Sequence, residues 1–108
     1  MKVKLLILLM TFGVSTASLA DPLELAKKSG CLACHSVDKK VVGPSWKDVS
    51  AKYKGDAEAK AKLVQKVKAG GKGNWTEMTK GVPMPPYSPR VPDQDIEALV
   101  TFVLSLAQ

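Results

Sequence analysis

The sequence is organised around Cys31-Leu32-Ala33-Cys34-His35, a stretch that contains both cysteines and the only histidine of the 108 residues. Two thiols three positions apart can add to the two vinyl groups of one porphyrin, and the adjacent imidazole is then held beneath the iron. C-x-x-C-H is the attachment pattern of c-type haem. The stretch therefore predicts one covalent haem c, with its iron, at the centre of the fold.

Two other kinds of site use similar residues. A thioredoxin-like dithiol also has the C-x-x-C spacing, but it lies near a βαβ pattern, and this chain has no strand-rich segment. A structural zinc site needs four nitrogen or sulfur ligands, whereas the stretch supplies three. Both alternatives are weaker than the haem interpretation.

Residues 1–20 have the composition of a secretory signal peptide. Lys2 and Lys4 precede an apolar run from Leu5 to Val14, and small residues follow up to Ala20. That run is shorter than the roughly 20 residues of a membrane-spanning helix. We expect cleavage before Asp21 and export to the periplasm. Export agrees with a haem c, because its thioether bonds are made outside the cytoplasm.

The remaining residues, 21–108, are enough for one domain. A chain of this size buries only about 60% of its unfolded surface and is marginally stable, so a large apolar cofactor would supply much of the core. Removing Lys2 and Lys4 leaves 14 basic against 10 acidic residues, a formal charge of +4. The lysines are scattered among alanine and valine with few aromatic residues, which does not indicate a nucleic-acid groove. Such a surface either is only exposed to solvent or surrounds a docking site for an acidic protein partner.

The apolar spacing predicts an all-α domain with four short helices. Asp21 and Pro22 start the first helix, which Ser29-Gly30 ends. The other three are expected over residues 46–54, 57–69 (capped by Asp56) and 93–107. Residues 75–92 contain five prolines and no helical period, so a long loop is expected there, and loops of this length are usually functional.

This loop also holds the candidates for a second axial ligand. Histidine is excluded because His35 is the only one, which leaves Met84, Met78, a lysine or an open position. Met84 is favoured because Pro83, Pro85 and Pro86 stiffen its backbone, whereas Met78 lies in a polar, flexible stretch. The alternative for either methionine is that its side chain only fills space in the hydrophobic core. His/Met ligation fills the iron and suits electron transfer.

The chain resembles the small bacterial class I c-type cytochromes of the cytochrome c-551 (c8) type. The resemblance covers nearly all of residues 21–108 and rests on the motif at 30–35, on 41–44 with 47–49, on 66–70, on Trp75 and on 83–86. It implies the cytochrome c fold, with Cys31 and Cys34 as thioether anchors and His35 and Met84 as iron ligands. It also implies that the Pro44 carbonyl accepts a hydrogen bond from His35 and that Trp75 contacts a haem propionate. Lys66 stands where relatives often have an arginine.

The sequence departs from the family pattern at two places. The link from Trp75 to Pro83 is longer than usual, and Tyr87 stands where many relatives have an asparagine that bonds the methionine sulfur. The Tyr87 phenol either donates to the weakly accepting sulfur or points to solvent and packs loosely.

Together these features predict a soluble periplasmic one-electron carrier between respiratory redox partners. It would be a monomer and not an enzyme. The alternative is a haem protein with a labile sixth position that acts as a small-ligand sensor or a peroxidase, and a haem-free thiol–disulfide module is a third possibility. Lysines flank the motif in sequence, among them Lys39 and Lys40, and we expect them to steer partners with acidic docking surfaces.

Overall fold

The structure, a computed structural model, describes residue 13 and residues 21–107. Over these residues the regular elements are helices, as predicted, with two isolated β-bridges and no strand. The helices are α1 (Pro22–Lys28), the 3₁₀ turn η1 (Cys31–Ala33), α2 (Trp46–Lys52), α3 (Ala59–Ala69), α4 (Thr76–Thr79) and α5 (Asp93–Ser105). The expected signal peptide lies outside the described residues except for Gly13. None of the described helices is long and apolar enough to cross a bilayer.

Helix α1 has the caps that its sequence predicts. The Asp21 carboxylate accepts a hydrogen bond from the Leu23 N–H at 3.1 Å, and Pro22 occupies the first helical position. Gly30 then adopts a φ of 84°, a left-handed conformation that favours glycine. The reversal at Gly30 ends α1 and leads directly into η1, which carries Cys31.

Helices α2, α3 and α5 exist where the sequence predicts them but are each shorter. α2 ends at Lys52 and α5 at Ser105, two residues before the predicted ends. α3 begins at Ala59 with Glu58 at its N-cap position, so Asp56, which was expected to cap the helix, lies two residues before the cap. The Asp56 carboxylate accepts from the Glu58 N–H at 2.9 Å, as a capping side chain does, but residues 57–58 form a turn and not yet an α-helix. The same carboxylate forms an ion pair with Lys62. This local turn occupies the two residues that were expected to be helical.

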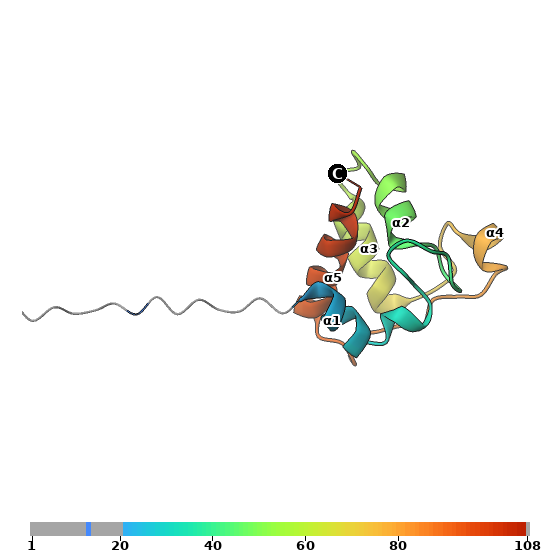
Figure 1. Ribbon diagram of the computed structural model, residues 1–108. Helices are drawn as coiled ribbons and strands as arrows, with labels where there is room; N and C mark the ends of the chain where they lie inside the picture. Colours follow the sequence, from blue (N-terminus) through green and yellow to red (C-terminus); the bar gives the residue numbers. More distant parts are fainter. Residues whose placement is uncertain (1–12, 14–20, 108) are drawn as a thin grey trace, which may run out of the picture.

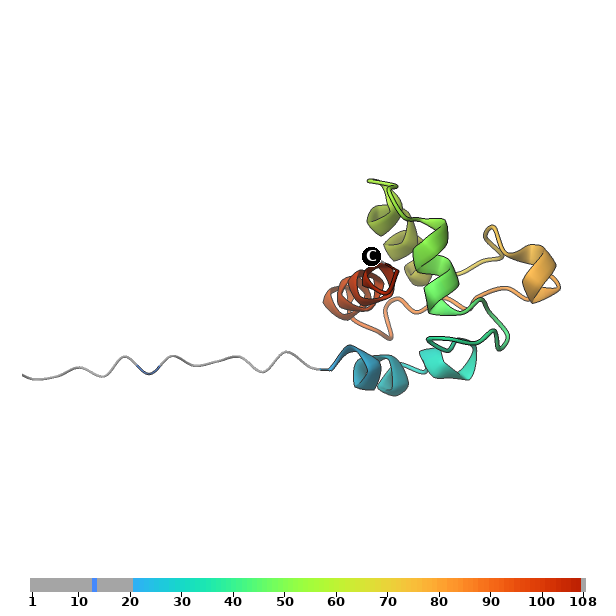
Figure 2. The same ribbon diagram turned by 45° about the horizontal axis from the view of Figure 1, so that its top comes forward.

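The prediction that residues 75–92 form only a loop is wrong, because they contain α4. This single helical turn ends at Thr79. Lys80 follows with a φ of 56°, and the Gly81 N–H donates to the Thr76 carbonyl at 3.0 Å. A four-residue helix has no hydrophobic period to detect, which explains why it was missed. Figures 1 and 2 both show α4 standing apart from the other helices.

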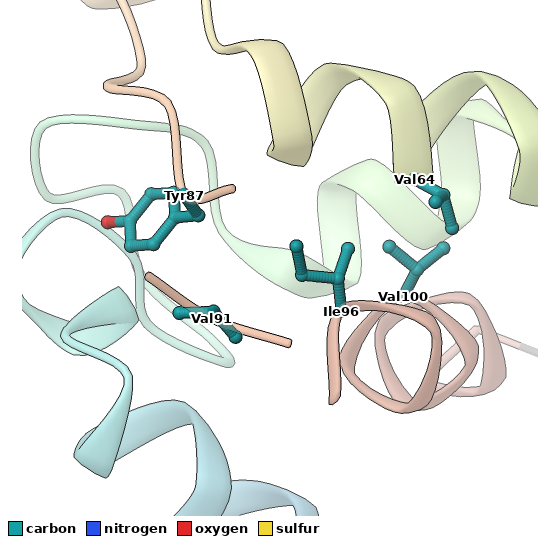
Figure 3. Close-up of a cluster of buried hydrophobic side chains, with 5 residues drawn as sticks. All are labelled: Val64, Tyr87, Val91, Ile96 and Val100. Atoms are coloured by element: carbon teal, nitrogen blue, oxygen red, sulfur yellow. The ribbon is translucent and has the colours of Figure 1, made fainter. Parts of the chain in front are cut away.

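Helix α5 is the centre of the packing and contacts α1, α2 and α3. Its face carries Ile96 and Val100 into a cluster with Val64 of α3 and with Tyr87 and Val91 of the preceding loop (Figure 3). Ile96 is completely buried. Burying an isoleucine side chain contributes about 1.5–3 kcal/mol, so this cluster fixes α3 and the proline-rich loop (residues 83–92) against α5.

A second cluster joins the haem motif to the same helix. It consists of Ala26, Cys31, Trp46 and Leu99, which come from α1, η1, α2 and α5. The side chains of Leu99 and Val100, which belong to different clusters, both also line one large cavity. The fold therefore places this cavity where its two apolar clusters meet.

Candidate functional site

The cavity brings together the residues that the sequence singled out. Its volume is about 440 Å³, within the usual range of small-molecule sites. Its lining includes all six predicted cofactor residues: Cys31, Cys34, His35, Pro44, Trp75 and Met84. Most of the other lining side chains are apolar, and they come from α2, α3, α5 and the proline-rich loop.

The imidazole of His35 is held in a defined tautomer by the backbone. Its Nδ1 lies 2.8 Å from the Pro44 carbonyl oxygen. A carbonyl only accepts hydrogen bonds, so Nδ1 carries the proton and donates it. Nε2 is then the unprotonated nitrogen and can bind a metal ion. Such a bond to the second ring nitrogen is the usual means of orienting a histidine ligand.

Two residues that the sequence analysis did not assign to the site restrict the same ring. A Cβ on Gly43 would lie 2.6 Å from His35 Cε1, so only glycine fits there. The indole of Trp46 stacks on the imidazole, with ring centroids 6.0 Å apart and 24° between the planes. Gly43 lies within residues 41–44, part of the family resemblance, and that resemblance could have indicated its role in the site. Trp46 was recognised only as part of an amphipathic helix.

The backbone of Met84 is fixed by pairing with the segment after α3. The Gly71 N–H donates to the Met84 carbonyl at 2.8 Å, and the Met84 N–H donates to the Gly71 carbonyl at 3.0 Å. Gly70 allows this approach, because a Cβ there would lie 2.5 Å from the Met84 oxygen. The Met84 side chain lines the cavity, whereas Met78 of α4 does not.

Side chains that donate hydrogen bonds are frequent among the cavity-lining residues that follow α2 in sequence. Lys62, Lys66, Lys72 and Asn74 line the cavity together with Trp75. The Lys52 ammonium group lies 4.6 Å from the centre of a Trp75 ring, a cation–π contact that restricts the indole. No carboxylate is among the lining residues. This part of the cavity is therefore suited to anionic groups, such as the propionates of a haem.

The environment of Tyr87 excludes one of its two predicted roles. The side chain is 5% exposed and packs in the cluster around Ile96, so the interpretation as a loosely packed, solvent-pointing residue is wrong. Arg90 lies over the ring, with its guanidinium carbon 4.9 Å from the centroid. Burial raises the pKa of the Tyr87 phenol. The group is therefore neutral at physiological pH and keeps its proton for donation.

These features fit a covalently held haem better than a metal ion alone. Two thiols and an oriented imidazole lie in one apolar cavity of sufficient size. Among the described residues, no three His, Cys, Asp or Glu side chains gather as a metal-ion site would require. Burial also raises the pKa of the Cys31 thiol, whereas a redox-active dithiol needs a lowered value.

The comparisons with known proteins agree with this geometry. A sequence profile of the cytochrome c family matches residues 23–107. Over 93 residues the chain is 57% identical to cytochrome c-551 of Allochromatium vinosum, which corresponds to 86% of this chain and 93% of that protein. It is 46% identical over 85 residues to cytochrome c-551 of Pseudomonas aeruginosa, covering 79% of this chain and 76% of that protein.

The fold is also similar to that of a solved relative. The crystal structure of wild-type Nitrosomonas europaea cytochrome c552 aligns with a TM-score of 0.69 and 44% identity. The alignment covers 78% of this chain and 98% of that structure. The chain therefore belongs to the cytochrome c family, as a small class I c-type cytochrome that binds one haem c covalently.

Proposed function

We propose that the protein is a soluble periplasmic one-electron carrier in which Cys31 and Cys34 anchor the haem and His35 and Met84 are the axial ligands. The observation that carries the proposal is the hydrogen bond from His35 Nδ1 to the Pro44 carbonyl, which leaves Nε2 for the iron. When bound, the haem supplies one centre that gains and loses a single electron. The protein is not an enzyme on this proposal.

The assignment of Met84 rests on two features of its loop. Its backbone is paired with Gly71 through two hydrogen bonds, and its side chain lines the same cavity as His35. Because the backbone is restrained, the thioether would be available in the cavity as a ligand when the haem is bound. Methionine opposite histidine also raises the reduction potential relative to stronger donors.

The alternative, a sensor or peroxidase with a labile sixth position, has less support. Such sites usually place an acid–base group near the iron, and the chain has no second histidine. Its only arginine, Arg90, stacks on Tyr87 and is absent from the cavity lining. No observation favours this function over electron transfer.

The proposed location and partners follow from the sequence and from exposure. Residues 1–20 have the composition of a signal peptide, which supports export to the periplasm. Lys39 and Lys40 are exposed in the segment that follows the haem motif, and Lys40 forms an isolated β-bridge with His35. Positive charge close to the motif would attract acidic surfaces on redox partners.

The ligand assignment can be tested with the two methionines as a matched pair. Met84→Ala should remove the weak charge-transfer band that a Met-ligated ferric haem shows at the red end of the spectrum. Met78→Ala should leave the band unchanged, because Met78 lies on α4 outside the cavity lining. A band that survives in Met84→Ala and disappears in Met78→Ala would contradict the assignment. In both variants the haem should remain attached through acid–organic extraction, since the thioethers are intact.

A further inference from the structure

The hydroxyl of Thr79 is a buried donor without a partner. Among the described residues it is the one buried side-chain polar atom for which no hydrogen bond exists. Leaving such a group unpaired costs about 1–3 kcal/mol, and buried polar groups in native proteins nearly always have a partner. The hydroxyl therefore requires an acceptor that the polypeptide itself does not supply.

The backbone around Thr79 is already satisfied and holds the residue in place. Its N–H donates to the Trp75 carbonyl at 2.9 Å, and its own carbonyl accepts from the Val82 N–H at 3.1 Å. Two hydrogen bonds within one turn fix where the side chain begins. Thr79 also lines the cavity that contains Cys31, His35 and Met84. The missing acceptor is accordingly expected inside the haem cavity.

We propose that Thr79 is a haem-positioning residue whose hydroxyl donates a hydrogen bond to a haem propionate. The cavity lining near Thr79 in sequence, residues 62–75, is rich in donors: Lys62, Lys66, Lys72, Asn74 and Trp75. Since no carboxylate of the protein lines the cavity, the propionates are the carboxylate acceptors present once haem is bound. The proposal rests on the covalent haem and is independent of which proteins exchange electrons with it.

The Met84 sulfur is the competing acceptor, but a thioether accepts hydrogen bonds only weakly. A carboxylate accepts a charge-assisted bond that is roughly twice as strong as a neutral one. Because α4 lies in the unusually long link from Trp75 to Pro83, the proposal also gives that link a role. It delivers one additional donor to the cofactor.

The test compares holoprotein variants by their midpoint potential at pH 7. A hydrogen bond to a propionate draws negative charge away from the iron, and hydrogen bonding and net charge both set haem potentials. Thr79→Val, which keeps the shape and loses the hydroxyl, should therefore have a lower potential than the wild type. Thr79→Ser should restore it. Thr76→Val, an exposed change on the same helix, should have no effect.

Proton NMR of the ferrous wild-type protein identifies the acceptor without any substitution. The Thr79 hydroxyl proton should exchange slowly and show a nuclear Overhauser effect to a propionate methylene group. Equal potentials for wild type and Thr79→Val, failure of Thr79→Ser to restore the potential, or a contact only to the Met84 methyl group would each overturn the proposal.

Discussion

Gly70 offers a sharp test of how the methionine loop is held. Its φ of 70° and ψ of −163° belong to a region that is almost exclusive to glycine, and occupying it with another residue costs about 1–3 kcal/mol. In Gly70→Ala the new Cβ would also lie 2.5 Å from the Met84 oxygen and 2.8 Å from Pro86 N. These are backbone atoms and cannot rotate away, so we expect the two hydrogen bonds between Gly71 and Met84 to break.

The expected loss is about 3–5 kcal/mol of unfolding free energy, which adds the backbone strain to about 1 kcal/mol for each of the two hydrogen bonds. For a domain of this size that corresponds to a decrease in Tm of roughly 12–40 °C. Thermal unfolding followed by circular dichroism measures the decrease, and the Met-to-iron band of the ferric protein reports on the ligand. The band should weaken well before the helices unfold.

Gly55→Ala is the matched control for this experiment. Gly55 has a similar φ of 81°, but nothing lies within 4 Å of the position its Cβ would take. Only the left-handed backbone is penalised there, at about 1–2 kcal/mol, and the Met-to-iron band should be unaffected. If the two variants lose the same stability and both keep the band, then the close approach of Gly70 does not hold Met84.

Three further predictions concern other parts of the molecule. Ser50→Ala should lower the unfolding free energy by about 1–2 kcal/mol in denaturant titration, because the Ser50 hydroxyl donates to the Leu104 carbonyl and accepts from the Ala107 N–H. If the Tyr87 phenol donates to the Met84 sulfur, Tyr87→Phe should shift the midpoint potential and leave the Met-to-iron band in place. An unchanged potential would mean that Tyr87 serves only in packing. Electron transfer to an acidic partner should slow as added salt shortens the Debye length, which is about 10 Å at 0.1 M. Lys39→Glu should slow the transfer more than Lys60→Glu. Stopped-flow rates that do not change with salt would contradict electrostatic steering of the partner.

Lys60 is a better control position than Lys72 for the charge reversal at Lys39. Both are exposed lysines far from Lys39 in sequence. Lys72, however, lines the haem cavity, whereas Lys60 does not. Reversing the charge at Lys72 would change the field at the iron as well as the docking surface, so the two effects could not be separated.

The sequence predicted the features that depend on local chemistry or strict periodicity. The caps of α1 follow from Asp21 and Pro22, and the core face of α5 follows from the spacing of Ile96, Leu99 and Val100. The haem motif was evident because a C-x-x-C-H pattern has few other uses. In each case a short stretch of chain contains all of the information.

The features that were missed depend on contacts between distant segments or on very short elements. The stacking of Trp46 on His35 and the pairing of Gly71 with Met84 join residues that no local pattern connects. α4 was missed because one turn has no period, and α3 starts two residues later than predicted because residues 57–58 form a turn after Asp56. The Thr79 hydroxyl becomes noticeable only when its burial is known.

The cavity at the meeting point of the two apolar clusters links maturation to folding. If it were kept dry and empty, a void of about 440 Å³ would cost up to about 10 kcal/mol at the penalty measured for engineered cavities. That is as large as the whole stability of a typical domain. A polypeptide without its cofactor is therefore expected to gain little free energy by folding around this space, and to be more accessible to proteases than the holoprotein. Covalent attachment of the haem would then make stable folding depend on the cofactor.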